Sequence, residues 1–340
     1  MTSQLHVLVT GANGHLGNNL LRELLKHGHF KVKGSVRNIN DKRPFIGLDC
    51  NIVYADMFDR QSLASAFRDV DILFHVAAVF SHWSRHPKRD ILQANLTQTK
   101  NVFELAKEYG VDKVVYVSSI AALDANQAVM DESTWGSHFP NMYFKSKNAA
   151  EQLAWRLAEQ LNIDMVSVLP SAMIGGHVYR QLTPTMNLID KILSNSLPFD
   201  PQYHINFVDV EDVAKGMILA AEKGRVGHRY ILGTEQSMST TELFHLAHQI
   251  NPLIKIPNKL GKSLQLLLAT LFESWAFISG QPPLLMRGNV RHYFKKDELL
   301  CIDKAKTELG YRPRPAEQVV KALMSESKQS RLREPSASSS

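Results

Sequence analysis

Tyr143 and Lys147 are the two side chains whose types and spacing are best suited to proton transfer. Because they are four residues apart, they lie on one face of a helix. An ammonium group beside a phenol stabilises the phenolate, so that the tyrosine can give or take a proton near neutral pH. Ser118 and Ser119 end the preceding predicted strand, where a serine hydroxyl can hold the same substrate oxygen. These residues predict acid–base chemistry at a substrate oxygen.

A glycine-rich stretch near the start of the chain predicts a dinucleotide site. Residues 10–17 read Thr-Gly-Ala-Asn-Gly-His-Leu-Gly, follow an apolar run at 5–9 and precede a helical pattern at 18–27. A strand, a glycine-rich turn and a helix in this order are the context in which such a motif binds a dinucleotide. The glycines allow a tight turn, a close approach of backbone to a pyrophosphate, and close packing of helix on strand. The helix N-terminus adds unpaired N–H groups and a partial positive charge.

The end of the second predicted strand favours NADP over NAD. An NAD-specific site places Asp or Glu there, to accept a hydrogen bond from the ribose 2′-hydroxyl. Residues 35–38 contain no carboxylate. Arg37 can instead pair with a 2′-phosphate through charge-assisted hydrogen bonds, and Lys42 and Arg43 add positive charge nearby. The alternative is that Arg37 stacks on the adenine and that both cofactors bind.

Other candidates for chemistry carry less weight. His82 and His86 are four residues apart, but no carboxylate or cysteine completes a metal-binding set, so we expect no metal. Phe80, Trp83 and Met173 follow predicted strand ends, where they either border the substrate or pack. Neither a Gly-x-Ser-x-Gly elbow nor a His-Glu-x-x-His helix is present, so a hydrolase is not expected.

The elements that must position these residues alternate between strand and helix. Further strands are predicted at 30–36, 51–54, 72–76, 113–117 and 164–169, and helices at 60–67, 91–109 and 149–160, the last beginning a turn or two earlier. The almost wholly apolar strand at 72–76 suits a sheet that is buried on both faces. Six alternations of strand and helix predict an α/β fold, a Rossmann-type doubly wound parallel sheet with right-handed crossovers.

Beyond Pro170 this alternation loosens, which predicts a second region. We expect helices at 185–196, 210–223 and 240–249, the last capped by Ser239, and strands at 205–208 and 229–232. The chain then divides into a cofactor-binding core at 1–170 and a smaller mixed substrate-binding region at 171–324, whose strands return to the core. Ser, Lys and Arg dominate from 325 to 340, which predicts a disordered tail.

An unusual segment at 260–278 carries large apolar residues at helical spacing, interrupted by polar ones. This pattern predicts an amphipathic helix and not a membrane span. We expect its apolar face to be buried in the C-terminal region or at a subunit interface. The alternative is that it forms a wall of an apolar substrate pocket or a peripheral contact with a membrane surface.

Composition limits the classes of partner and location. The chain has 340 residues, 44% of them hydrophobic, enough for one large or two interlocked domains. Its formal net charge of +6 comes without an arginine-rich or lysine-rich block, which argues against nucleic-acid binding. Two cysteines imply no disulfide framework and fit a reducing, cytoplasmic location. The first predicted strand begins about five residues in, leaving no room for a signal peptide, and no apolar run is long enough to span a membrane.

Several short motifs accompany the two sites: Val36-Arg37, Asp56-Met57, His75-Val-Ala-Ala78, Val117-Ser-Ser119, Asp131-Glu-Ser-Thr-Trp135, Pro170-Ser171 and Leu309-Gly-Tyr-Arg-Pro-Arg-Pro315. With them, the chain resembles the extended short-chain dehydrogenase/reductase superfamily over about residues 5–323. Within it, the chain is most similar to dihydroflavonol-4-reductase-like proteins and to hopanoid-associated sugar-epimerase-like proteins. The resemblance is specific for the fold and the class of cofactor, and unspecific for the substrate.

The resemblance implies roles for individual residues. Tyr143 is the expected catalytic acid or base, Lys147 binds the nicotinamide ribose, and Ser119 polarises the reacting carbonyl or hydroxyl. Asp56 accepts a hydrogen bond from the adenine amino group, beside Met57. Contacts with the cofactor are expected from Gly11, Asn13, Gly14, His15, Leu16, Gly17, Arg37, Asp56, Met57, Ala77, Ala78, Tyr143, Lys147 and Pro170. The side chain of His15 is expected to be incidental, and Ser118 to be a strand-end residue near the cofactor.

The function that the resemblance implies is an NADP(H)-dependent oxidoreductase that reduces a ketone or aldehyde of a fairly apolar small molecule, or oxidises the matching alcohol. One alternative is a nucleotide-sugar epimerase or dehydratase with tightly bound NAD, for which Arg287 and Arg291 are the available diphosphate partners. Others are a 3β-hydroxysteroid dehydrogenase-like enzyme and a non-catalytic NADP-binding regulator. Many relatives dimerise through helices that correspond to 91–109 and 143–160, and the sequence is compatible with a monomer or a homodimer.

Overall fold

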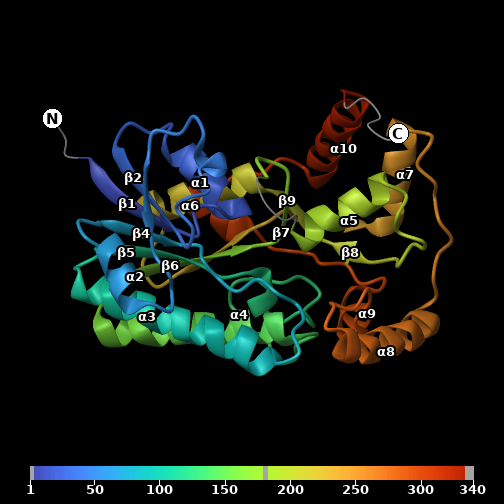
Figure 1. The fold of residues 1–340 in the computed structure, drawn as a ribbon, viewed down its shortest axis with the longest axis horizontal. Helices are drawn as coiled ribbons and strands as arrows, with labels where there is room; N and C mark the ends of the chain where they lie inside the picture. The colour runs from blue at the N-terminus through green and yellow to red at the C-terminus, as the bar shows by residue number, and fades with distance from the viewer. Residues whose placement is uncertain (1–3, 179–182, 334–340) are drawn as a thin grey trace.

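The computed structural model describes residues 4–178 and 183–333, and its centre is a seven-stranded parallel sheet (Figure 1). The strands follow the order β10-β6-β5-β4-β1-β2-β3. Their bounds are β1 Leu5–Thr10, β2 Phe30–Val36, β3 Asn51–Tyr54, β4 Ile72–His75, β5 Lys113–Val117, β6 Asp164–Pro170 and β10 Arg229–Leu232. Every strand pair in this sheet is parallel. The order reverses between β1 and β4, which is where doubly wound sheets bind their ligands. The predicted fold class is confirmed.

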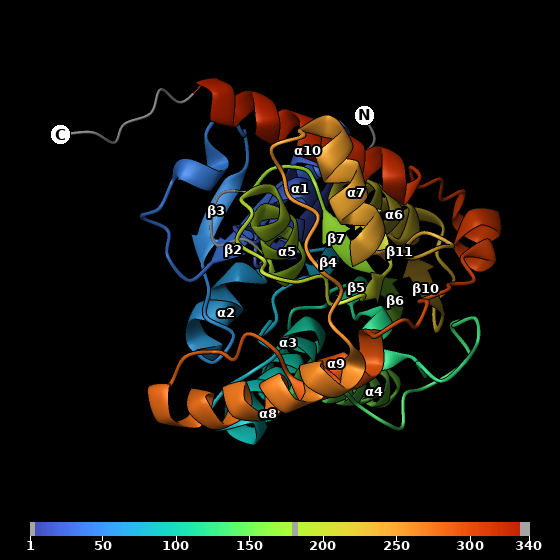
Figure 2. The same ribbon diagram turned by 90° about the vertical axis from the view of Figure 1, so that its right-hand side faces the viewer.

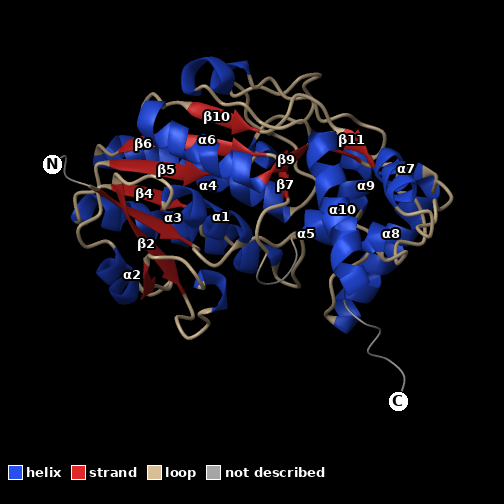
Figure 3. Ribbon diagram, turned by 90° about the horizontal axis from the view of Figure 1, so that it is seen from above, coloured by secondary structure: helices blue, strands red, loops and turns tan. Residues whose placement is uncertain are grey.

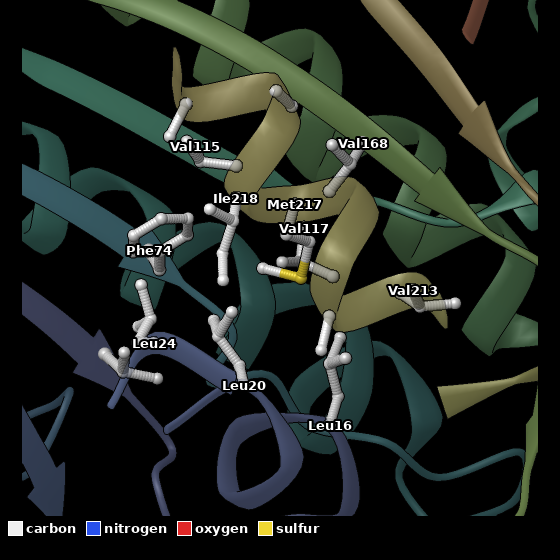
Figure 4. Packing of buried hydrophobic residues seen from close by; sticks show 14 of the residues in the cluster. Leu16, Leu20, Leu24, Phe74, Val115, Val117, Val168, Val213, Met217 and Ile218 are labelled. Atoms are coloured by element: carbon white, nitrogen blue, oxygen red, sulfur yellow. The ribbon is translucent and has the colours of Figure 1, made fainter. Parts of the chain in front are cut away.

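Helices cover both faces of the sheet, because successive strand residues point to opposite sides. Val7 and Val9 of β1 belong to the hydrophobic cluster on one face, and Leu8 between them belongs to the cluster on the other. The first face packs against α1 His15–Leu24 and α6 Val210–Lys223 (Figure 4). The second face packs against α2 Arg60–Ala66, α3 Ala94–Glu108 and α4 Met142–Leu161. The two helix layers thus hold the sheet in place, and the carboxyl ends of its parallel strands all lie at the same end of the sheet.

Two helices begin earlier than their apolar patterns predict. The first, expected at 18–27, begins directly after the N-cap Gly14, so the last residues of the glycine-rich stretch form its first turn. The helix expected at 149–160 begins two turns earlier, within the range that the sequence allowed. Its N-cap Asn141 accepts hydrogen bonds from the N–H groups of Tyr143 (2.9 Å) and Phe144 (3.3 Å). The cap thus places Tyr143 in the first turn of α4. A π-helical segment, Lys88–Gln93, precedes α3.

The single strand predicted at 205–208 is wrong. Two short strands replace it, β8 His204–Ile205, antiparallel to β11 Met238–Ser239, and β9 Phe207–Asp209, parallel to β7 Ala172–Ile174. Between them, Asn206 donates from its side-chain amide to three carbonyl oxygens, those of Thr234, Gln236 and Glu298. Its own N–H donates to the Glu298 carboxylate at 3.0 Å. These bonds hold Asn206 at the point where the chain passes from one small sheet to the other.

Helices from the second half of the chain gather beside the sheet edge (Figures 2 and 3). They are α5 Pro184–Leu193, α7 Thr240–Ile250, α8 Lys262–Ser279, α9 Arg287–Tyr293 and α10 Ala316–Arg333. Elsewhere in the chain, short helical segments lie at Arg43–Phe45, Ile120–Ala122 and Ala305–Leu309. Apolar residues of α5, α7 and α10 form one cluster around β7 and β9. The helix α10 continues to Arg333, and the disorder expected from residue 325 stays a prediction. Residues 179–182 and 334–340 lie outside the described residues.

The apolar face predicted at 260–278 is not buried within this chain, and its burial at a subunit interface stays a prediction. The segment does form a helix, α8, but its buried residues are Gln265, Ala269 and Ala276. Large apolar residues on its other side are exposed. Within residues 4–178 and 183–333, no helix is both long and apolar enough to cross a membrane.

Candidate active site

A cavity of about 650 Å³ opens at the carboxyl ends of the central strands. It is bordered by the turn between β1 and α1, by the ends of β2, β4, β5 and β6, and by the first turns of α4. The cavity is lined by all the residues from which catalysis or contact with the cofactor was expected: Gly11, Asn13, Gly14, His15, Leu16, Gly17, Arg37, Asp56, Met57, Ala77, Ala78, Ser119, Tyr143, Lys147 and Pro170. The fold thus brings together segments that are far apart in the sequence. The individual roles of these residues remain predictions.

The glycine-rich turn has no room for side chains at two of its glycines. Gly11 has φ +67°, and a Cβ on it would lie 3.0 Å from the Cα of Ala77. A Cβ on Gly17 would lie 2.3 Å from the carbonyl oxygen of Gly11. Gly14 is the N-cap of α1 and carries no side chain to occupy the N–H groups of the first turn. The turn therefore presents bare backbone and a helix N-terminus to the cavity, which fits a pyrophosphate.

The side chain of His15 has a structural role that the sequence did not reveal. Its Nε2 lies 2.7 Å from the carbonyl oxygen of Gly175, which can only accept, so Nε2 carries the proton. Burial lowers the pKa of His15, which keeps the ring neutral. The bond ties the first turn of α1 to the turn that follows β7.

Thr10 joins β1 to β4 at the point where the strand order reverses. Its hydroxyl oxygen accepts from the N–H groups of Val76 (3.0 Å) and Ala77 (3.1 Å) and lies 3.0 Å from Nδ1 of His75. Burial, and secondarily the charge of Lys147, lowers the pKa of His75 to about 3. His75 is therefore neutral, and its Nδ1 accepts a hydrogen bond from the hydroxyl group of Thr10. This network holds the small residue Ala77 against Gly11.

Arg37 lies directly after β2 at the rim of the cavity. It is exposed and has no hydrogen-bond or ion-pair partner among residues 4–178 and 183–333. Arg43, in contrast, is paired with Asp41 at 2.8 Å. Its charge is therefore compensated, and Arg37 is the better candidate for a 2′-phosphate.

Tyr143, Ser119 and Lys147 form the polar group at the inner end of the cavity. Burial raises the pKa of Tyr143 to about 12, and a hydrogen bond with Ser119 opposes this shift. Burial lowers the pKa of Lys147 to about 8, opposed by the charge of Glu151. The Lys147 ammonium donates to the carbonyl oxygen of Val117 at 2.9 Å. At neutral pH, both the phenol and the ammonium are therefore protonated.

Aromatic rings enclose Tyr143. The ring of His82 stacks on it at 4.8 Å between centroids and 15° between planes, and Phe80 meets its ring edge to face at 4.9 Å. Burial lowers the pKa of His82 to about 4, so this ring is neutral. Of the other proposed border residues, Met173 lines the cavity, whereas Trp83 contacts Phe277 of α8. In the described part of the chain, no three His, Cys, Asp or Glu side chains gather as metal ligands.

The sequence analysis missed Glu151, a fully buried carboxylate. It accepts from the hydroxyl groups of Ser118 (2.6 Å) and Ser167 (2.8 Å) and forms a two-point ion pair with Arg229 at 2.9 and 3.0 Å. Ser118 is thus turned toward this network. The signal was present, because Glu151 follows Lys147 by four residues on the same helix.

Asn95 is a second residue that sequence analysis missed. Its side chain accepts from the N–H of Val79 at 2.8 Å and donates to the Val79 carbonyl and the Ser146 hydroxyl, both at 3.1 Å. These bonds fix the loop after β4 against α4. The loop in turn carries Phe80 and His82 to the ring of Tyr143.

Comparisons with known proteins agree with this geometry. The model of the NAD dependent epimerase/dehydratase family matches residues 7–233. A cinnamoyl-CoA reductase of Medicago truncatula is 30% identical over 274 residues, 74% of this chain and 83% of that protein. A bifunctional dihydroflavonol 4-reductase/flavanone 4-reductase of Malus domestica is 27% identical over 274 residues, 74% of this chain and 78% of that protein. The crystal structure of gox2253 is 34% identical, has a TM-score of 0.80, and covers 95% of this chain and 98% of its own.

Proposed function

The chain belongs to the NAD-dependent epimerase/dehydratase family of extended short-chain dehydrogenases/reductases, and on this basis we propose that it is an NADP(H)-dependent reductase of an apolar ketone or aldehyde. One observation carries the proposal. Tyr143 is buried and protonated at neutral pH, and it lines the same cavity as Ser119, Lys147 and the glycine-rich turn. A phenol in this state is an acid, as carbonyl reduction requires.

Ser119, Tyr143 and Lys147 each have a different role at the substrate oxygen. When bound, the nicotinamide cofactor supplies the hydride, or accepts it in the reverse direction. Ser119 donates a hydrogen bond that orients the carbonyl oxygen, and Tyr143 gives that oxygen its proton. The Lys147 ammonium stabilises the phenolate that remains, because a positive charge close to it favours the charged form. The apolar surroundings of these groups exclude water and lower the local dielectric constant, which strengthens their electrostatic interactions.

The cofactor half of the cavity supports NADP. The pyrophosphate would lie at the backbone of Gly11 and Gly14 and at the N-terminus of α1, whose N-cap carries no side chain. The adenosine would lie toward Asp56 and Arg37 at the rim. Because Arg37 has no partner in the described part of the chain and no carboxylate follows β2, the 2′-phosphate finds a cation where an NAD site has an acid.

The substrate half supports an apolar compound. Among the described residues, its lining is mainly apolar or aromatic and includes Phe80, Ile120, Met173, Ile205 and Tyr293. Relatives named as cinnamoyl-CoA and dihydroflavonol reductases fit an aromatic carbonyl substrate.

Arg287 and Arg291, the expected partners of a nucleotide-sugar diphosphate, do not line this cavity. Arg287 pairs with Glu273 of α8 at 2.6 Å, and Arg291 is exposed elsewhere. This arrangement favours the reductase over an epimerase or dehydratase.

A matched pair of proteins tests this function. We expect the wild type to oxidise NADPH in the presence of apolar aromatic aldehydes or ketones, and Tyr143→Phe to lower kcat by about 10²–10⁴-fold. The binding of NADPH by the variant should change little, because the phenol hydroxyl is not a phosphate ligand. Wild-type turnover of a nucleotide sugar without net use of NADPH would overturn the proposal, as would full activity of Tyr143→Phe.

A further inference from the structure

One side of α8 exposes a continuous stripe of large apolar residues. We define the α8 stripe as Leu264, Leu267, Leu271, Trp275 and Ile278, whose side chains recur at intervals of three and four residues on one helix face. Each exposes between 48% and 73% of its surface. Apolar surface of this extent, contiguous on one element, marks an interaction site.

The helix is held from its opposite side, which leaves the stripe free. The buried side-chain amide of Gln265 donates to the carbonyl oxygens of Pro201 (2.9 Å) and Leu260 (2.7 Å). Ala269 packs with Leu285 and Val290 of the segment that includes α9. The position of α8 is therefore set mainly by contacts on the side opposite the stripe, and in Figure 2 the helix runs along an outer edge of the molecule.

Basic side chains lie at both ends of α8. The segment 255–298 contains seven Lys or Arg residues and three acidic residues, a net charge of +4. Lys262 stands at the first turn of α8, and Arg85 donates to the carbonyl oxygen of Ile278 in its last turn at 2.9 Å. Basic side chains from two segments far apart in the sequence thus lie at the two ends of one helix.

The α8 stripe is also connected to the active-site cavity. The loop that begins with Phe80 and His82 in the cavity continues to Trp83, which contacts Phe277, and to Arg85. Only a few residues of this loop separate the cavity from the residues that contact α8. A surface that covered the stripe would lie next to the substrate end of the site.

We propose that α8 docks the protein on an anionic lipid membrane. The stripe enters the boundary between headgroups and acyl chains, while the surrounding Lys and Arg residues contact anionic headgroups. Docking places the cavity beside the bilayer, so that an apolar carbonyl compound dissolved in the membrane can enter it; this second part rests on the proposed function. A second copy of the chain fits the stripe less well, because the basic side chains at the ends of the two α8 helices would then approach each other.

Vesicle sedimentation tests the docking directly. The probes are vesicles of phosphatidylcholine alone and of phosphatidylcholine with about one third phosphatidylglycerol, which carries the negative charge. We expect wild-type protein to bind the anionic vesicles at low salt and to be released at high salt. Leu267→Ser/Leu271→Ser should lower the partition coefficient by about tenfold or more. The matched control, Ile46→Ser/Leu253→Ser, changes two aliphatic residues that are even more exposed elsewhere, and should bind like wild type.

Fluorescence reports on the stripe itself. Subtracting the spectrum of Trp275→Phe from that of wild type isolates the signal of Trp275, which should shift to the blue on binding anionic vesicles. No binding by wild type, or equal loss in both double variants, would overturn the proposal. A concentration-dependent dimer that shifts Trp275 without vesicles would assign the stripe to a second copy instead.

A catalytic variant separates docking from the proposed chemistry. Tyr143→Phe should bind vesicles like wild type while losing turnover. If wild type binds vesicles but reduces no carbonyl compound, the proposed function fails and the docking stands. If it reduces a water-soluble aldehyde but ignores vesicles, the docking fails and the proposed function stands.

Discussion

Replacing Arg37 with alanine should weaken NADPH binding selectively. Arg37 is exposed, lies at the cavity rim after β2 and has no partner in the described part of the chain. A hydrogen bond to a charged group contributes about 1.5–3 kcal/mol, and solvent exposure places Arg37 near the lower end. About 1.5 kcal/mol corresponds to roughly tenfold in Kd. We therefore expect Arg37→Ala to raise the Kd for NADPH by about tenfold and to leave that for NADH nearly unchanged.

Calorimetric titration with both cofactors distinguishes this account from its alternative. If Arg37 stacks on the adenine, both cofactors lose affinity equally, and the argument for the 2′-phosphate is refuted. The matched control is Arg43→Ala, because Arg43 lies on the same segment but is already paired with Asp41. It should alter the NADPH affinity less than Arg37→Ala does. High salt should shrink the wild-type preference, since the contact is exposed.

Two further variants test the supporting structure. Gly17→Ala puts a Cβ 2.3 Å from a backbone carbonyl oxygen, so it should cost about 1–3 kcal/mol of stability and impair NADPH binding. The control is Gly28→Ala, which meets no atom within 4 Å; equal thermal melts and equal affinities for the two variants would contradict the close packing. The wild-type kcat/KM for reduction should fall as pH rises through about 8, where Lys147 loses its proton. Glu151→Gln removes a charge that raises the pKa of Lys147, so the alkaline limb should move to lower pH; an unmoved limb would show that Glu151 does not tune the lysine.

Sequence patterns predicted the cofactor half of the molecule well because its determinants are local. A strand, three spaced glycines and a helix can be seen within a few residues, and the described turn leaves no room for a Cβ at Gly17. Tyr143 and Lys147 share a helix face by their spacing alone. Their common cavity required only that parallel strands end at one edge of a sheet.

The errors came from interactions between distant residues. Periodicity correctly placed the apolar residues of α8 on one face, but it contains no information about what covers that face. The strand at 205–208 breaks because Asn206 bonds to Glu298, far along the chain. The stacking of His82 on Tyr143 depends on a loop that Asn95 fixes, and no local pattern encodes it. Sequence alone therefore predicted the glycine-rich turn and the helix that carries Tyr143 and Lys147 better than the residues that surround the substrate half of the cavity.

The most direct test of the account is to identify the cofactor that the protein retains and prefers. Freshly purified protein is denatured, any released nicotinamide cofactor is identified, and cofactor-free protein is titrated with NADPH and NADH. We expect no stoichiometric retained cofactor and an affinity for NADPH about tenfold or more above that for NADH, as for a reductase that exchanges its cofactor in every turnover. Stoichiometric, tightly held NAD would contradict it and identify an epimerase or dehydratase instead.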